Sequence, residues 1–434
     1  MPAKKIGPAN TFPSVTQFTK QHTPSHPLSN MLQPNHVSIK RVVSCFIMTS
    51  TQRVAVFHRQ STMPTFPSHW APCSGSIESG EAPWETATRE IAEETNLQVS
   101  ASALQAGLYV DVPLPPRKND LATQRVIRVY PFLVNLSTPD FDLKLKGTEH
   151  DTFKFVTIQE LEALQPAVPA LATAFHHATR GLFLRHVPET IQAWRQDREN
   201  GASTLTVQAL QLLQSAKDEA EQVQWAEQMR MMRPTMVAIT NALNRVIDNQ
   251  ATPSLVMQQM KEETDWLVHY GCTVVLQKAQ QSVKEGSTPF RIATFSRSST
   301  IVAILNQVQK ESTDQEVPID IVCAESNPGG EGAFMAKDVN ATCIADEELQ
   351  QRIRQDGIDL VLVGADCLVS DKLVVNKVKT RVLAEVCAEY QVPIWCFTDS
   401  FKIWDDCFPP PLEDIFECID RPLLQVISKG VADV

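Results

Sequence analysis

The chain lacks any apolar run of the roughly 18 residues that a membrane helix requires, so no membrane segment is expected. It also lacks a basic excess. Its 39 Lys and Arg residues face 50 Asp and Glu residues, a net charge of −11, which disfavours nucleic acid as the main partner. Its ten cysteines include no CxxC pair and no His-rich neighbourhood. That pattern argues against a structural zinc site and favours reduced thiols in a cytosol-like compartment.

No acidic residue precedes Glu78, and residues 1–36 have no periodic apolar face. The richness of this segment in Pro, Ser, Thr and Asn predicts a disordered tail. The absence of Asp and Glu from this tail suggests a mitochondrial transit peptide. Against it, the tail has no Arg and has many helix-breaking prolines. A secretory signal with a hydrophobic centre is not seen. We therefore expect a cytoplasmic protein, with a mitochondrial location as the alternative.

The rest of the chain changes pattern twice. Residues 37–183 mix strand-like segments with a few helices, which predicts an α/β domain. Residues 186–285 read as a helical subdomain. In residues 286–434 short apolar runs alternate with helices, which predicts crossover units and a Rossmann-like parallel sheet. Ligands of such sheets bind beyond the carboxyl ends of the strands. The polar residues expected there are Ser296, Glu325, Asp366 and Asp399.

A helix expected from about residue 83 to residue 95 would carry Glu90, Glu93 and Glu94 within about a third of its circumference. Such like charges repel unless a cation offsets them, and carboxylate oxygens suit hard cations such as Mg²⁺ or Mn²⁺. The plain alternative is a solvated acidic face. A separate stripe of the same helix is expected to face the core: Trp84, Ala87 and Ile91.

The spacing around these glutamates resembles the Nudix box. Gly75 is followed after five residues by Glu81 and, after seven more, by "REIAEETNL". The last glycine of the box is replaced by Asn96, and Asn also adopts the left-handed conformation at a helix end. The resemblance covers about residues 37–183. It implies an α/β/α sandwich that binds a divalent metal and hydrolyses a nucleoside diphosphate linked to another moiety, such as a nucleotide sugar.

The resemblance also implies roles for single residues. Glu90, Glu93 and Glu94 would hold Mg²⁺ or Mn²⁺, while Glu81 and Arg89 would orient them through a charge-assisted pair. Gly75 would belong to the substrate-binding loop. Glu149, in "KGTEHD", is the loop candidate for a general base, against a plain exposed acid. The box leaves the substrate open, because flanking loops such as residues 111–124 select it.

In the second half, single residues have plain interpretations. Asp366 could cap a turn, Asn376 could be the N-cap of a helix that "NKVKT" opens, and Arg233 could be a surface arginine. The helix that begins near Ser298 could hold a phosphate with its amides or simply be capped by that serine.

Taken together, these segments resemble one family. "DRENGAS", "RPTMVAITNALNR", "CAESNPGGEG", "VLVGADCLVSDKLVVNKVKT" and "PIWCFTDSFK" occur in the order found in the alpha, beta and delta subunits of the exchange factor for eukaryotic initiation factor two. That superfamily includes the isomerases of methylthioribose-1-phosphate and ribose-1,5-bisphosphate. The resemblance covers about residues 186–428 and implies a homodimer formed through the C-terminal part. It assigns phosphate and sugar binding to Arg233, Asn376 and Lys377, and the catalytic acid to Asp366.

This sequence departs from the isomerases at three places. Thr294 or a neighbour stands where they have a catalytic cysteine, Asn200 replaces the Arg of Arg-Gly-Ala, and Lys379 replaces a glycine. Threonine cannot perform thiol chemistry, and strand alternation would point Cys367 away from Asp366. We therefore favour a module that binds a phosphorylated sugar or nucleotide. An aldose–ketose isomerase and a regulatory binding protein of translation initiation remain the alternatives.

Overall fold

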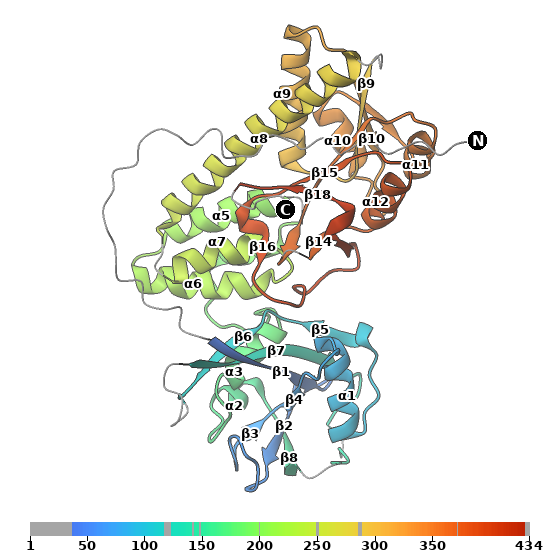
Figure 1. The fold of residues 1–434 in the computed structure, drawn as a ribbon. Helices are drawn as coiled ribbons and strands as arrows, with labels where there is room; N and C mark the ends of the chain where they lie inside the picture. Colours follow the sequence, from blue (N-terminus) through green and yellow to red (C-terminus); the bar gives the residue numbers. More distant parts are fainter. Residues whose placement is uncertain are drawn as a thin grey trace, which may run out of the picture.

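The computed structural model describes residues 37–116, 123–140, 143–146, 149–198, 200–248, 251–284, 289–370 and 372–429. The expected tail of residues 1–36 lies outside this range. Figure 1 shows the first half of the chain below and the second half above. Within the described ranges, no helix is both long and apolar enough to cross a bilayer.

The first half is built on an eight-stranded mixed sheet. Its strands are β1 (Val37–Met48), β2 (Val54–Arg59), β3 (Trp70–Ala71), β4 (Cys73–Ser76), β5 (Leu104–Ala106), β6 (Val110–Leu114), β7 (Gln124–Asn135) and β8 (His150–Val156). Its helices are α1 (Pro83–Thr95), α2 (Ile158–Glu162) and α3 (Leu171–Ala178). The strand β1 lies centrally, because it pairs in parallel with β7 and antiparallel with β2 and β4.

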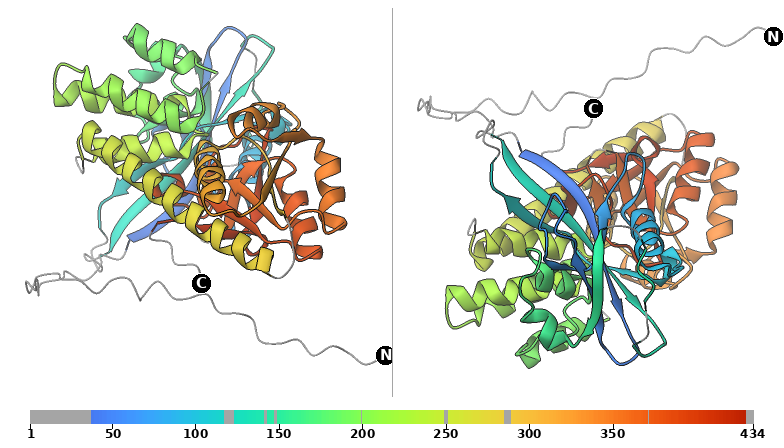
Figure 2. Two further views of the ribbon diagram at one scale, coloured as in Figure 1. Left: turned by 90° about the horizontal axis from the view of Figure 1, so that it is seen from above. Right: turned by 90° about the horizontal axis from the view of Figure 1, so that it is seen from below.

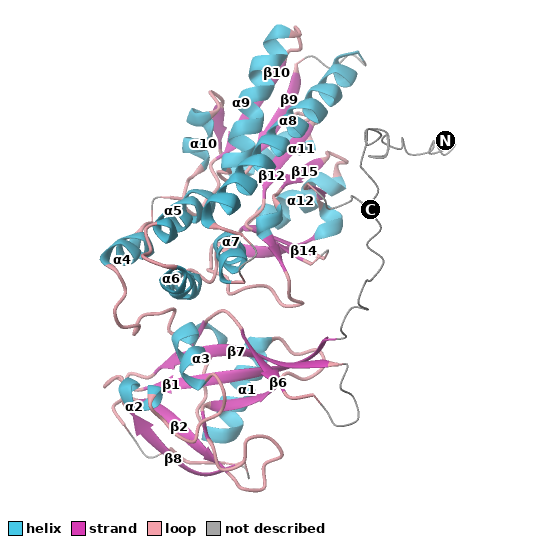
Figure 3. Cartoon of the chain, turned by 90° about the vertical axis from the view of Figure 1, so that its left-hand side faces the viewer, coloured by secondary structure: helices cyan, strands magenta, loops and turns pink. Residues whose placement is uncertain are grey.

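Alternation along β1 sends its side chains to two cores. Phe46 packs with Phe175 of α3 on one face, whereas Cys45 and Ile47 pack with Ile91 of α1 on the other. The sheet therefore lies between α1 and α3, as the expected α/β/α sandwich requires. Figure 3 shows these helices against the strands of the lower part.

A helical subdomain follows. It contains α4 (Glu189–Gln196), α5 (Ala202–Gln214), α6 (Glu219–Met232), α7 (Val237–Ile247) and α8 (Pro253–Lys284). With 32 residues, α8 spans about 48 Å. It packs against α5 and α7 near one end and against α9 (Ser299–Asp314) and β9 (Phe290–Thr294) near the other, so it ties the helical part to the sheet that follows (Figure 2).

The C-terminal part holds a six-stranded parallel sheet in the order β11-β10-β9-β12-β15-β18. Its strands are β9 (Phe290–Thr294), β10 (Ile319–Ala324), β11 (Thr342–Ile344), β12 (Leu360–Gly364), β15 (Ile394–Phe397) and β18 (Gln425–Ile427). The flanking helices are α9 (Ser299–Asp314), α10 (Gly332–Asp338), α11 (Asp346–Arg354) and α12 (Thr380–Glu389). Leu360 and Leu362 face α8 and α9, whereas Val361 and Val363 face α11 and α12. Helices thus cover both faces, as in a Rossmann-like fold.

A second, four-stranded sheet lies beside it in the order β16-β13-β14-β17. Its strands are β13 (Cys367–Val369), β14 (Leu373–Lys377), β16 (Ile403–Trp404) and β17 (Phe416–Asp420). Here one expectation is wrong. Asn376 does not cap a helix, because it lies in β14, and Lys379 is the N-cap of α12.

One expectation for the first half also needs correction. Trp84 is 43% exposed and does not share the core of Ala87 and Ile91. It occupies the first turn of α1. By contrast, Asn96 ends α1 in the left-handed conformation, at φ 59° and ψ 12°, as expected of its place in the box.

Candidate functional site

The helix α1 and the loop before it gather the charged residues of the first half around Arg89. The guanidinium of Arg89 donates to both carboxylate oxygens of Glu81, at 2.8 and 2.9 Å, and to Glu90 at 2.7 Å. A longer bond of 3.3 Å reaches Glu93. Arg89 and Thr86 together lower the pKa of Glu81 to about 2. The expected pairing of Glu81 with Arg89 is therefore present as a two-pronged ion pair.

Gly75 lies against the carboxylate of Glu90. A Cβ atom at this position would stand 1.8 Å from Glu90 Oε1 and 1.9 Å from Cδ, so only glycine allows the present placement of Glu90. Burial raises the pKa of Glu90, and the ion pair with Arg89 opposes that shift. The close approach gives the glycine of the box a steric reason.

Glu94 is the most enclosed of the three glutamates, with 6% of its surface exposed. Neither of its carboxylate oxygens has a hydrogen-bond partner among the described residues. Burial raises the pKa of Glu94 to about 8, and the nearby Cys73 thiol and the backbone of Ser74 offset only part of the shift. His150 Nδ1 lies 3.7 Å away, but burial lowers its pKa to about 4, so it supplies no positive charge near neutral pH.

Glu149 approaches the same cluster from the loop before β8. Its charge raises the pKa of both Glu90 and Glu94. Among the described residues no group of three His, Cys, Asp or Glu side chains forms a ready-made metal cage. The donor chemistry nonetheless fits a hard cation, because carboxylates repel one another here and the two buried oxygens of Glu94 lack partners.

In the second half the expected residues lie at the carboxyl ends of the parallel strands. Ser296, Glu325, Asp366 and Asp399 follow β9, β10, β12 and β15. Ser298 caps α9 by accepting a hydrogen bond from the amide of Ile301.

Three charged side chains surround Asp366. Lys377, at the end of β14, is 2% exposed and forms an ion pair with Glu331. Burial raises the pKa of Asp366, while Lys402 and Lys377 counteract the shift. The amide of Asn376 donates to the carbonyl of Gly364 at 2.9 Å, which anchors the end of β14 to the end of β12.

Arg233 belongs to a different neighbourhood. Its guanidinium donates to the carbonyls of Trp194 and Arg195, at 2.7 and 3.0 Å, and to that of Asp197. It thus holds the C-terminal end of α4 and the residue that follows it, rather than contacting Lys377. Within the described residues, the structure brings Asp366, Asn376 and Lys377 together and leaves Arg233 with the helical subdomain.

Sequence reasoning missed Glu331, Lys402 and Cys396. Cys396 lies on β15 beside Val363, and its thiol is 3.5 Å from the carbonyl of Gly364. Burial raises its pKa to about 12, so the thiol stays protonated near neutral pH. The adjacent apolar runs "LVLVGAD" and "PIWCFTDS" could have indicated its proximity to Asp366, had their pairing in the sheet been known. Thr294 ends β9 with a buried hydroxyl that lacks a partner in the described part of the chain.

Two protein families match the chain. The NUDIX domain matches residues 39–178, and the Initiation factor 2 subunit family matches residues 198–415, half of the chain. Ribose 1,5-bisphosphate isomerase of Archaeoglobus fulgidus is 22% identical over 236 residues, which cover 50% of this chain and 72% of that protein. The isomerase of the same name from Methanocaldococcus jannaschii is 25% identical over 180 residues, which cover 39% of this chain and 54% of that protein.

Among solved structures, translation initiation factor eIF-2B of Pyrococcus horikoshii OT3 is 18% identical with a TM-score of 0.44, and the match covers 56% of this chain and 95% of that one. The match with the relative from Methanocaldococcus spans only about half of that protein. The chain belongs to the Initiation factor 2 subunit family and carries a NUDIX domain in its first half.

Proposed function

We propose that the first half is a metal-dependent hydrolase of a nucleoside diphosphate linked to another moiety, such as a nucleotide sugar. The observation that carries this proposal is the buried carboxylate of Glu94. Its two oxygens have no partner among the described residues, and the charges of two further acidic side chains, Glu90 and Glu149, raise its pKa. A nearby cation would offset both the burial and the repulsion.

The proposed ligands for Mg²⁺ or Mn²⁺ are Glu90, Glu93 and Glu94, as the NUDIX match supports. When bound, the metal supplies charge neutralisation for the phosphates and a water of lowered pKa. The chain itself contributes orientation. Arg89 holds Glu90 through its 2.7 Å bond and is in turn held by Glu81. Glu149 is proposed as the base that receives a proton from the attacking water.

The experiment is a screen of the purified protein, with Mg²⁺ or Mn²⁺, against nucleoside diphosphate derivatives. Glu93→Gln and Glu94→Gln are expected to abolish product release while circular dichroism stays that of the parent. Glu385→Gln is the matched control for Glu93→Gln, because both glutamates are exposed on a helix, but Glu385 lies on α12 in the other half. Turnover that survives in both Nudix variants would overturn the metal assignment.

For the second half, we propose a module that binds a phosphorylated sugar or nucleotide, within a homodimer formed through the C-terminal part. Lys377 supplies a buried positive charge next to Asp366. Calorimetry with ribose phosphates is expected to detect binding that Lys377→Ala weakens.

Isomerase activity is the second candidate, because relatives with that name match this half and Asp366 has a raised pKa suited to an acid. Against it, the nearby thiol of Cys396 is held protonated. Rapid conversion of ribose-1,5-bisphosphate or methylthioribose-1-phosphate would establish the isomerase and exclude a module that only binds.

A further inference from the structure

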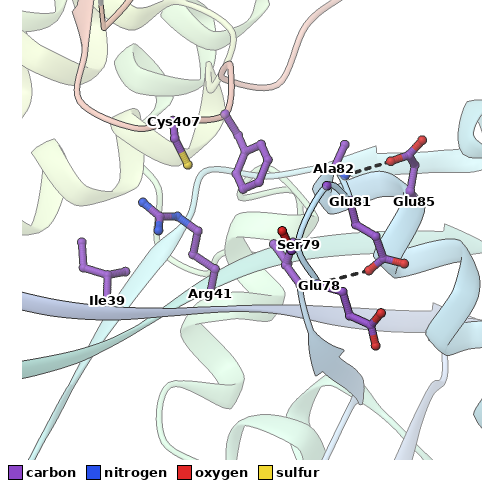
Figure 4. A pocket seen from close by; sticks show the side chains of 11 residues that line it. Ile39, Arg41, Glu78, Ser79, Glu81, Ala82, Glu85 and Cys407 are labelled. Atoms are coloured by element: carbon purple, nitrogen blue, oxygen red, sulfur yellow. Dashed lines mark hydrogen bonds between the residues drawn. The ribbon is translucent and has the colours of Figure 1, made fainter.

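A pocket opens where the two halves meet, beside the loop that leads into α1 (Figure 4). Its volume of about 530 Å³ lies in the range of small-molecule sites. The first half contributes Ile39 and Arg41 from β1 and residues 77–82 from the loop. The opposite wall is made by Cys407 and Phe408, which follow β16 in the second half. In Figure 4, Cys407 reaches toward Arg41 from the C-terminal loop.

The wall from the second half is fixed in place by Asp406. Its side chain is 1% exposed and accepts hydrogen bonds from the hydroxyl of Tyr130 at 2.5 Å and from Arg41 at 3.3 Å. The ring of Phe408 meets the ring of Tyr130 edge to face at 5.7 Å between centroids. Trp404 donates from Nε1 to the carbonyl of Phe408 at 2.8 Å. The two residues beyond Asp406 are therefore held at the pocket before any ligand arrives, which reduces the entropy lost on binding.

The pocket combines flat, apolar surface with hydrogen-bond donors and hydrogen-bond acceptors. Phe408 offers an aromatic ring, and Ile39 and Ile77 offer aliphatic surface. Arg41 has five N–H donors, of which Asp406 accepts from one. Glu78 is exposed at the rim and presents acceptor oxygens. A planar ring that carries both acceptor nitrogens and an amino group would satisfy these walls.

The charge of the rim excludes a bare phosphate as the occupant. Glu78, Glu81 and Glu85 line one side, against the single positive charge of Arg41. Glu81 also borders the Nudix cluster, because it pairs with Arg89, which donates to Glu90. The rest of a ligand whose ring lies in this pocket could thus extend past Glu81 to the carboxylates of Glu90, Glu93 and Glu94.

We propose that this pocket binds the amino-bearing nucleobase of the hydrolase substrate, so that a residue of the second half, Phe408, selects the substrate of the first. The inference rests on the proposed hydrolase function and adds the base-binding site to it. Adenine, cytosine and guanine carry the required amino group, whereas a base-free sugar phosphate has no group for these walls.

The first test uses Cys407 as a reporter of occupancy. Cys407 and Cys343 are both exposed, but only Cys407 lines the pocket. The full-length protein is alkylated with iodoacetamide, without metal, in the presence of AMP, CMP, GMP or ribose 5-phosphate, and each cysteine is followed by peptide mass spectrometry. At tenfold excess over its dissociation constant, at least one nucleotide should slow alkylation of Cys407 about tenfold, since only free protein reacts. Cys343 should be unaffected throughout.

Protection of Cys407 by none of the three nucleotides, or equal protection by ribose 5-phosphate, would overturn the base site. Since no hydrolysis is involved, protection without any turnover would leave the base site standing and refute the hydrolase instead. Turnover without protection would refute the base site and leave the hydrolase standing.

The second test measures substrate selection. Phe408→Ala should raise KM, or weaken the nucleotide protection, by about tenfold or more, because base stacking is lost. Phe408→Leu keeps apolar packing against Tyr130 and should show most of the same loss, which separates stacking from folding. Phe334→Ala is the matched control, because Phe334 is 63% exposed on α10 and does not line the pocket. Unchanged nucleotide protection in both Phe408 variants would refute the proposal.

Discussion

Replacing Gly75 by alanine would test whether the placement of Glu90 controls catalysis. The new methyl group would stand 1.8 Å from Glu90 Oε1, whereas ordinary contacts begin at 3.4 Å, so the carboxylate must move by roughly 1.6 Å. The obstructing atoms are the end of a flexible side chain, and rotation of Glu90 relieves the overlap. The fold should therefore survive while the carboxylate leaves its position beside Arg89.

The expected effects on stability and on rate differ in size. Loss of the 2.7 Å bond between Arg89 and Glu90 should lower the free energy of unfolding by about 1 kcal/mol, because both side chains remain partly exposed. A displacement of more than 1 Å at a reacting centre costs on the order of 100-fold in rate, which is about 2.7 kcal/mol of activation free energy. Urea titration would measure the first quantity, and initial rates with Mg²⁺ would measure the second.

A double-mutant cycle identifies the cause. On a Glu90→Ala background the obstructing carboxylate is gone, so Gly75→Ala should change neither stability nor residual rate beyond the cost of ordinary loop substitutions. Single Gly75→Ala protein that retains a rate close to that of the parent would refute the steric reasoning. An equal loss of stability on both backgrounds would show that alanine acts through the backbone and not through Glu90.

Further predictions concern charge and burial elsewhere. Burial lowers the pKa of His177 to about 4 from an ordinary 6.5. Because the unfolded state therefore binds a proton at higher pH than the folded state, the free energy of unfolding should fall by roughly 3 kcal/mol as the pH drops from 6.5 to 4. His177→Gln should flatten this part of the profile in pH-dependent urea titrations, and an unchanged slope would contradict the assignment. Arg89→Lys cannot make the two-pronged pair with Glu81 and should reduce turnover even though the charge is kept; parental turnover would count against an orienting role. Asp406→Ala leaves Tyr130 without its acceptor and should lower the free energy of unfolding by about 3 kcal/mol, as a calorimetric melt compared with Asp405→Ala would reveal.

Local patterns were sufficient to predict the elements that carry the candidate sites. The expected helix from residue 83 to residue 95 coincides with α1, and Asn96 ends it in the left-handed conformation. Alternating apolar runs correctly indicated the parallel sheet, with Ser296 and Asp366 beyond the ends of its strands. These predictions succeeded because helix periodicity, end conformations and strand alternation depend on neighbours within a few residues.

Properties that depend on distant parts of the chain needed the tertiary structure. The placement of Trp84 and Asn376 was wrong, because Trp84 stays exposed in the folded chain and the pairing of β14 with β17 holds Asn376 in a strand. The thiol of Cys396 lies near Asp366 only because β15 pairs with β12. No local pattern indicated that Glu94 would be enclosed.

The pocket between the halves shows the same division most clearly. The motifs of the sequence determined that each half would carry its own charged site, since the residues of each motif are close along the chain. Only the tertiary structure decided that Asp406 would meet Tyr130, 276 residues away, and bring Phe408 to the loop before α1. Three properties depend on which surfaces exclude water together: burial, repulsion between like charges, and access for a ligand. That exclusion is a property of the folded chain as a whole.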